Sequence, residues 1–369
     1  MKKVLCLVLA MVLMLAVFAG CGSKETTPST DTNSSASNVA PEQKTEEKTE
    51  EKTEEKTEEP EVDFSTPVVL KVADILPDSN LTNTYVLKIE EEITERSNGA
   101  ITFENYFTGT LGTVKEMAEA LVIGSCDIAM ITTATVAGYI PTAAICDMPF
   151  MFKDMEQARA AIVEYADEIY AGSEATLGHW MCTFTQGFNQ LCNNKAPIET
   201  IDDLYNLKVR VNQSELQIAA WNALGANATP MGGNDMYAAL QQGTVDANVI
   251  TSSSAVTDQY WDIQKYFTVD INSEIATQVW FMSNACFDKL PEGYADLIME
   301  VYKQYTVDLW AERAANEQTN FDTLAEHMEV NYLDPAEREA FVEAVAPVWE
   351  EFGASIGQDL IDKVSSFAG

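Results

Sequence analysis

Apolar residues recur with two alternating periods along the chain from residue 63 onward. LKVADIL at 70–76 is a compact apolar run typical of a buried strand, and the next segment places Tyr85, Ile89 and Ile93 on one helical face. ITFENYF at 101–107 then alternates with a period of two, as strands do. We therefore expect an α/β fold in which strands and helices follow one another.

One pattern occurs twice. The segments EMAEALVIGSCDIAMIT (116–132) and DMYAALQQGTVDANVIT (235–251) are identical at seven of seventeen aligned positions. Each predicts a helix, a glycine that ends it and a buried strand, and Thr113 with Glu116 predicts a capping box before the first helix. Coincidence between two ordinary α/β units is the alternative. We interpret the copies as one unit from each of two lobes.

Hydroxyl side chains follow the strand of each copy. Thr132, Thr133 and Thr135 follow the first strand, and Thr251 and Ser252 follow the second. In open parallel sheets, ligands bind just beyond the carboxyl ends of the strands. The sequence therefore predicts a ligand cleft between the two lobes, lined by these five residues.

The first twenty residues have the features of an export signal. Lys2 and Lys3 precede the apolar run 4–18, which is too short to span a bilayer comfortably. The run ends in Ala-Gly-Cys, which resembles a lipobox and makes Cys21 the expected lipidation site. A non-lipidated signal peptide cut near Gly20 is the alternative.

Residues 21–62 carry the lipidated cysteine and a polar segment. Ser, Thr, Asn and Pro come first, followed by TEEK repeats at 45–59, with no aromatic residue. Such a segment cannot bury enough apolar surface to offset its ordering entropy, so we expect a disordered tether. These features predict an exported protein held by lipid on the outer face of the cell membrane, the periplasmic side where an outer membrane exists.

The charge of the chain restricts its partners. The full chain has 22 basic and 58 acidic residues. Residues 1–20 contribute 2 basic residues, and residues 21–62 contribute 5 basic and 12 acidic residues. The remaining domain has 15 basic and 46 acidic residues, a net charge of −31. Such a domain is a poor partner for nucleic acid. An anionic ligand would need one of five arginines: Arg96, Arg159, Arg210, Arg313 and Arg338.

The cysteines and histidines indicate no metal site. Five cysteines remain after Cys6 and Cys21: Cys126, Cys146, Cys182, Cys192 and Cys286. Their odd number and the absence of CxxC favour buried unpaired thiols, with a Cys182–Cys192 disulfide as the alternative. Only His179 and His327 offer imidazole, which excludes a histidine-rich metal site, and we expect neither a metal nor a cofactor.

One string resembles a catalytic motif. GASIG at 353–357 matches GxSxG, but it lies in a helical pattern, and no histidine follows His327. A nucleophile elbow needs a preceding strand and a later histidine, so this string does not predict one. The chain contains no P-loop, GxGxxG or HExxH, and we expect that it is not an enzyme.

Six segments in order resemble the solute receptors of tripartite ATP-independent periplasmic (TRAP) transporters, DctP type. They are LKVADILP, FTGTLGTVKEMAEALVIGSCDIAM, PFMF, GFNQLCNNKAPI, LKVRV and LGANATPMGGNDMYAALQQGTVDA. The resemblance extends from about Val68 to Phe352. It implies a two-lobed, periplasmic-binding-protein-like α/β fold with crossing strands and a long lobe-bridging helix. Such receptors capture an organic acid and deliver it to permease subunits driven by an ion gradient.

The resemblance also implies a division of the domain. We expect residues 63–186 to form the first part of lobe I and residues 187–275 the first part of lobe II. Residues 276–315 would return to lobe I as a crossing strand and the bridging helix. Residues 316–369 would form the C-terminal helical part of lobe II.

Arg210 in LKVRV matches the arginine that grips the ligand carboxylate in this family. Guanidinium geometry suits this role, and a surface salt bridge is the alternative. Asn189 stands where a second arginine is common, Gly233 where some members carry an aromatic residue, and Ile250 where an asparagine is usual. The neutral candidates for ligand contact are Asn189, Gln213, Asn248 and Gln278. A monocarboxylate, sugar acid or 2-oxo acid therefore fits better than a dicarboxylate.

The implied partners are a small organic acid and TRAP permease subunits, with the receptor itself a monomer. A receptor of the same fold that feeds a sensor kinase is the runner-up. An exported enzyme or an adhesive surface protein comes third, because no catalytic set and no tandem repeats are present.

Overall fold

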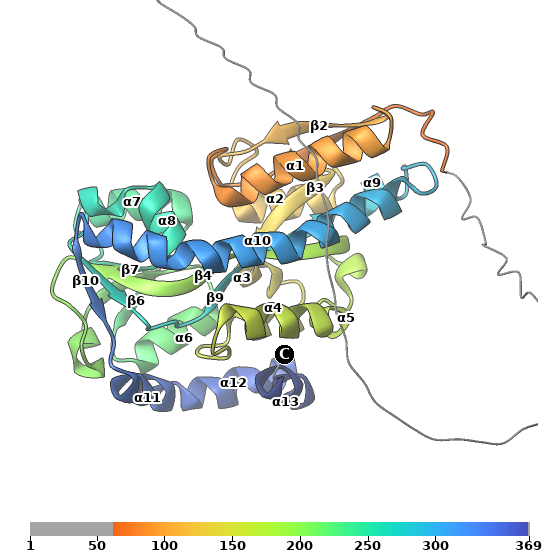
Figure 1. The fold of residues 1–369 in the computed structure, drawn as a ribbon. Coiled ribbons are helices and arrows are strands. Elements are labelled where there is room, and N and C mark those ends of the chain that lie inside the picture. Colours follow the sequence, from red (N-terminus) through yellow and green to blue (C-terminus); the bar gives the residue numbers. More distant parts are fainter. Residues whose placement is uncertain (1–61, 368–369) are drawn as a thin grey trace, which may run out of the picture. The chain divides into compact units, whose positions relative to one another are not determined.

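A computed structural model describes residues 62–367 of the chain. The predicted signal segment, Cys21 and the tether up to residue 61 lie outside the described residues. Strands and helices alternate in much of the described part, and runs of helices and 3-10 turns follow β3 (Ile128–Thr132) and β10 (Glu329–Tyr332) (Figure 1). No helix between residues 62 and 367 is both long and apolar enough to cross a bilayer.

The first group of strands contains the first copy of the repeated pattern. β1 (Val68–Ala73) pairs in parallel with β2 (Ile101–Tyr106) on one side and β3 (Ile128–Thr132) on the other. The helices α1 (Leu81–Arg96) and α2 (Val114–Val122) connect these strands. The antiparallel strand β9 (Ile275–Met282) joins the group beside β3. Both sequence runs that predicted strands here, at 70–76 and 101–107, overlap strands.

The second group contains the second copy. β5 (Lys208–Val211) pairs in parallel with β6 (Asn227–Pro230) and β7 (Ala247–Thr251). The connecting helices are α6 (Glu215–Ala223) and α7 (Gly233–Gln241). The parallel pair β8 (Tyr266–Val269) and β10 (Glu329–Tyr332) lies beside it, with β8 joined to β4.

A single long strand, β4 (His179–Asn193), joins the two groups. Up to Phe188 it pairs with β9, and from Asn189 it pairs with β7. The main sheet therefore has the order β2-β1-β3-β9-β4-β7-β5-β6. Gly187 is accommodated inside this one continuous strand.

The long predicted helix is α10 (Tyr294–Ala325). It contacts α1 and β4 as well as α8 and β10, so it runs along both groups of strands (Figure 1). Trp310 fixes it to β4 by donating from Nε1 to the Thr183 carbonyl at 2.9 Å.

The shorter elements complete the fold. The C-terminal part of the described chain forms three helices, α11 (Pro335–Ala344), α12 (Ala346–Ile356) and α13 (Gln358–Ser366). The other short helices and 3-10 turns are α3 (Thr133–Val136), η1 (Pro141–Asp147), α4 (Met155–Glu164), α5 (Ala166–Ile169), η2 (Ser173–Ala175), η3 (Ile201–Leu204), α8 (Ser252–Thr257), η4 (Tyr260–Asp262) and α9 (Asn284–Phe287).

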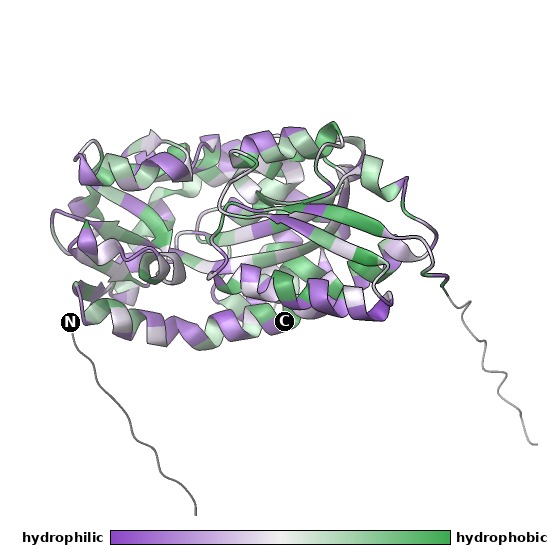
Figure 2. Cartoon of the chain, turned by 90° about the horizontal axis from the view of Figure 1, so that it is seen from above, coloured by the Kyte–Doolittle hydropathy of each residue, from purple (hydrophilic) through white to green (hydrophobic). Residues whose placement is uncertain are grey.

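Two apolar clusters form the core of residues 62–367. The larger cluster runs through β1, β3, β4, β9 and α1 and includes the fully buried Trp280. The smaller cluster packs β8 and the end of β4 against the C-terminal part of α10, with Phe267 and Phe321 in contact. Many helices in Figure 2 alternate between green and purple, as elements with one face on a core do.

The capping box predicted before α2 is confirmed. The Glu116 backbone N–H donates to Thr113 Oγ1 at 3.3 Å, and the Thr113 backbone N–H donates to Glu116 Oε2 at 2.7 Å. We expect Thr113→Ala to lower the free energy of unfolding by about 1 kcal/mol, the usual cost of a lost N-cap. Urea unfolding would measure it, with exposed Thr110→Ala as the matched control. Equal stability of the two variants would contradict a contribution from the box.

Candidate functional site

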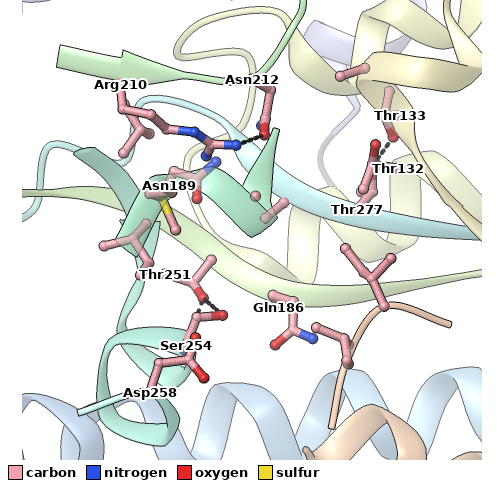
Figure 3. A pocket seen from close by; sticks show the side chains of 18 of the residues that line it. Thr132, Thr133, Gln186, Asn189, Arg210, Asn212, Thr251, Ser254, Asp258 and Thr277 are labelled. Atoms are coloured by element: carbon pink, nitrogen blue, oxygen red, sulfur yellow. Dashed lines mark hydrogen bonds between the residues drawn. The ribbon is translucent and has the colours of Figure 1, made fainter. Parts of the chain in front are cut away.

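The candidate site is a cavity of about 450 Å³ at the junction of the two groups of strands. Its wall comes from the β1–α1 connection, the ends of β3 and β7, the middle of β4, β5 and the start of α7. Figure 3 shows the polar side chains that point toward it. Most are hydroxyls and amides, with one guanidinium.

The strand ends of both repeated copies reach this one cavity. Thr132 and Thr133 line it from the end of β3, and Thr251 and Ser254 line it from the end of β7 (Figure 3). Thr251 also caps α8, because its Oγ1 accepts from the Ser254 backbone N–H at 3.3 Å. Thr133 shares a short hydrogen bond with Thr277 of β9. The two copies thus present their hydroxyl side chains to a common space.

Arg210 of β5 supplies the positive charge of the cavity wall. Its Nε and Nη2 donate to the Met231 carbonyl at 3.2 and 2.9 Å, and Nη2 also donates to Asn212 Oδ1 at 2.9 Å. Nη1 has no acceptor among residues 62–367. Burial lowers the pKa of Arg210 to about 10, so the guanidinium remains cationic at neutral pH. A ligand carboxylate that accepts hydrogen bonds from both Nη1 and Nη2 would displace Asn212 Oδ1 from Nη2.

Acidic side chains stand elsewhere on or behind the wall. Asp147 and Asp258 line the cavity, and Glu274 lies behind Asn189, whose Nδ2 donates to Glu274 Oε1 at 3.0 Å. Burial, with a smaller contribution from the Glu274 charge, raises the pKa of Asp147 well above its usual range. Burial also raises the pKa of Glu274 to about 7 and that of Asp258 above its ordinary value.

Residues 72–355 match the family described as bacterial extracellular solute-binding protein, family 7 (DctP). The chain belongs to this family. The predicted resemblance to DctP-type receptors of TRAP transporters is confirmed. The expectation that the protein is not an enzyme is also confirmed, because family 7 proteins are transport receptors of small organic acids that work with membrane permease subunits.

Curated relatives of this family 7 receptor are similar over most of their length. It is 27% identical to the C4-dicarboxylate-binding periplasmic protein DctP of Vibrio cholerae, covering 74% of this chain and 82% of the relative. It is also 27% identical to the 2,3-diketo-L-gulonate-binding periplasmic protein YiaO of Escherichia coli, covering 70% and 78%. These relatives favour the transport receptor over the sensor-kinase alternative.

Solved structures of the family have the same fold. A TRAP periplasmic solute-binding protein from a Polaromonas species, bound to D-erythronate, has a TM-score of 0.77 at 23% identity, covering 82% of this chain and 99% of that one. The sugar acid binding protein DctPAm of Advenella mimigardefordensis, in complex with galactonate, has a TM-score of 0.74 at 26% identity, covering 82% and 98%. The predicted two-lobed α/β fold with its long helix is therefore confirmed.

Several residues predicted to contact ligand lie outside the cavity wall of this receptor. Gln213 is exposed and lines a neighbouring cavity of about 350 Å³. Ser252 accepts from Asn320 Nδ2, and Gln278 accepts from Thr82 Oγ1 at 2.8 Å. Two more predicted residues do not line the cavity. Asn248 is buried, and Thr135 Oγ1 shares a hydrogen bond of 3.4 Å with Thr132 Oγ1.

Other wall residues were absent from the sequence prediction. They are chiefly the amides Gln186, Asn212 and Gln217, the carboxyls Asp147 and Asp258, and the hydroxyls Ser254 and Thr277. Gln186 and Asn212 adjoin segments that the sequence singled out, GFNQ and LKVRV, and this proximity was the available signal. Neither of the acidic wall residues, Asp147 and Asp258, directly adjoins such a segment.

The remaining candidate chemistry is accounted for. Ser355 of the GxSxG string lies within α12, and its Oγ donates to the Phe352 carbonyl at 2.8 Å. All five cysteines of residues 62–367 are buried and unpaired, including Cys182 and Cys192. Within the same residues no cluster of three or more His, Cys, Asp or Glu side chains could hold a metal.

Proposed function

We propose that this receptor captures a small organic monocarboxylate, such as a sugar acid or a 2-oxo acid, for delivery to a TRAP permease. One observation carries the proposal: among the described residues that line the cavity, Arg210 is the only basic side chain. A guanidinium with a free Nη1 suits a carboxylate, and burial strengthens such a charge-assisted hydrogen bond. The surrounding amides and hydroxyls suit an oxygen-rich ligand.

The same cavity disfavours a dicarboxylate. A second carboxylate would find no second cation among the described residues of the wall, where the neighbouring charged groups are the carboxyls Asp147 and Asp258. The relatives' names cover both classes, since one is named for C4-dicarboxylates and another for 2,3-diketo-L-gulonate. The charge of this chain's own cavity supports the monocarboxylate.

Ligand identification tests the function. Native mass spectrometry of the receptor as purified should show a retained small acid, and calorimetry on the ligand-free receptor should follow with gluconate, pyruvate and succinate. We expect gluconate or pyruvate to bind at least about tenfold more tightly than succinate, a difference of about 1.4 kcal/mol. Tightest binding of succinate would contradict the monocarboxylate assignment.

We further propose how the site is divided. Thr132 and Thr133 would contact ligand from lobe I, and Arg210, Asn189 and Thr251 from lobe II. The lobe boundaries proposed from the sequence separate these two sets: 63–186 and 276–315 for lobe I, and 187–275 and 316–369 for lobe II. The strand crossing at β4, and α10 running along both groups, support this division.

Cys21 is proposed to anchor the receptor, as a monomer, to the outer face of the cell membrane by lipid. Cys21→Ala should move the receptor from the membrane fraction to the soluble fraction or the medium. It should keep its thermal unfolding temperature, because the tether is not expected to pack on the core. Fractionation with antibody detection would measure this, and continued membrane retention would contradict lipidation.

A further inference from the structure

Asp147 is a buried carboxyl without a hydrogen-bond partner. It ends η1, its side chain is 6% exposed, and it lines the cavity. No group among residues 62–367 donates to either of its oxygens, and Oδ2 is fully enclosed. An unpaired buried carboxyl is costly, and native structures contain few of them. A ligand that supplies the missing partner would account for it.

Backbone contacts hold Asp147 close to a second carboxyl, that of Glu274. The Phe150 N–H, three residues after Asp147, donates to the Ser273 carbonyl at 2.7 Å. The Asn189 N–H donates to the Glu274 carbonyl at 2.9 Å, which fixes Glu274 behind the wall. Burial raises the pKa of both carboxyls. A nearby cation would favour the charged form of either carboxyl.

The positive charge of the cavity is separate from this carboxyl pair. Arg210 forms no ion pair with any acid among the described residues, and burial is the chief influence on its pKa. Arg338 does not neutralise the pair either, because its guanidinium lies over the Phe150 ring and Nε donates to the Ile271 carbonyl at 3.3 Å. One cavity wall therefore contains Arg210, which forms no ion pair with the described acids, and Asp147, which has no hydrogen-bond partner.

We propose that the ligand is a zwitterion, a small acid that also carries a cationic nitrogen. Its carboxylate meets Arg210, and its ammonium donates to Asp147, with Glu274 behind it. This assignment rests on the proposed capture of an organic acid and adds the charge of its other end. A plain hydroxy acid would satisfy Arg210 but offer Asp147 only a neutral hydroxyl, whereas an ammonium makes the stronger, charge-assisted hydrogen bond to a carboxylate. Complementary charge at both ends gives specificity for the zwitterion.

Matched ligand pairs test the proposal. Calorimetry on the ligand-free receptor would compare lactate with alanine, 4-hydroxybutyrate with 4-aminobutyrate, and 6-hydroxyhexanoate with 6-aminohexanoate. We expect the amino member of the best-fitting pair to bind at least about tenfold more tightly. Equal or tighter binding of the hydroxy members would overturn the zwitterion assignment while leaving acid capture intact. Failure of every acid, with none retained in the purified receptor, would contradict the proposed function itself.

The variant Asp147→Asn should reverse the order of affinity for the amino and hydroxy acids. Asp147→Asn keeps the shape of the side chain and removes its charge, so binding of the amino acid should weaken at least about tenfold. Binding of the hydroxy acid should be unchanged or tighter. Asp288→Asn removes an exposed carboxyl away from the cavity and is the matched control, and Glu274→Gln provides a second variant should Asp147→Asn fold poorly. Parallel loss of both ligand classes in Asp147→Asn and Glu274→Gln would mean that the pair is structural.

Discussion

Arg210→Ala should abolish most of the receptor's affinity for its acid. Removing one member of a buried, hydrogen-bonded charge pair typically costs about 2–5 kcal/mol. At about 1.4 kcal/mol per decade, this corresponds to roughly 30-fold to several-thousand-fold weaker binding. Calorimetry on the acid identified from the purified receptor would measure it.

Arg210→Lys should bind almost as weakly. An ammonium cannot make two parallel hydrogen bonds to a carboxylate, and it cannot reproduce the contacts with Met231 and Asn212 that hold the guanidinium in place. Arg159→Ala removes the same charge from α4, away from the cavity, and is the matched control. Binding of Arg210→Ala within about threefold of the Arg159→Ala control, less than half a decade, would show that no carboxylate is captured at Arg210.

The receptor should become less stable as the pH rises from about 4 to about 7. Burial raises the pKa of Asp74 and of Glu90 to about 7, with hydrogen bonds from the Leu76 backbone and from Asn105 opposing the shift. Between the ordinary carboxyl pKa and 7, the folded state holds protons that the unfolded state has released. Each group then lowers the free energy of unfolding by up to about 1.4 kcal/mol per pH unit.

Urea unfolding at pH 5, 6, 7 and 8 would measure this dependence. Glu90→Gln places an uncharged amide where the protonated carboxyl lies in the wild type. The free energy of unfolding of this variant should therefore fall less steeply with pH than that of the wild type. Glu95→Gln, on the same helix α1 but exposed, is the matched control and should retain the wild-type slope. Stability that rises from pH 5 to pH 7, or an unchanged slope in Glu90→Gln, would show that these buried carboxyls are not protonated in the folded state.

The repeated units could be predicted because each depends on local signals. Thr113 and Glu116 define where α2 begins, and Gly124 has a φ of 71° that favours glycine where the helix ends. The second copy repeats the signal at Gly243, whose φ is 70°. The apolar runs after both glycines are the buried strands β3 and β7. Local chemistry was therefore enough to place both strand ends at one cavity.

Which hydroxyls face the cavity could not be predicted from the strands alone. A helix begins directly after β7, so residues three apart share a face, and Ser254 joins Thr251 at the wall while Ser252 turns toward Asn320. The chain after β5 behaves similarly. Asn212 and Gln217 reach the cavity, and Gln213 between them is exposed.

The acidic part of the wall depends on contacts between distant segments. Asp147 takes its place through the hydrogen bond from Phe150 to Ser273, more than a hundred residues away. Gln186 is likewise fixed by Ser253, whose Oγ donates to Gln186 Oε1 at 3.1 Å. Periodicity describes only neighbouring residues, so it gives no information about such pairings.

The register shift in β4 has a mechanical consequence. Between Thr185 and Phe188 the pairing with β9 shifts register, Gly187 takes a φ of 100°, and its N–H donates to Thr185 Oγ1 at 2.9 Å. Rotation of one group of strands against the other can therefore concentrate in a few backbone torsions at this point, while the ladders on either side keep their hydrogen bonds. We therefore expect opening and closing of the cavity to turn about Gly187, with little of the ligand's binding energy spent on bending the sheet.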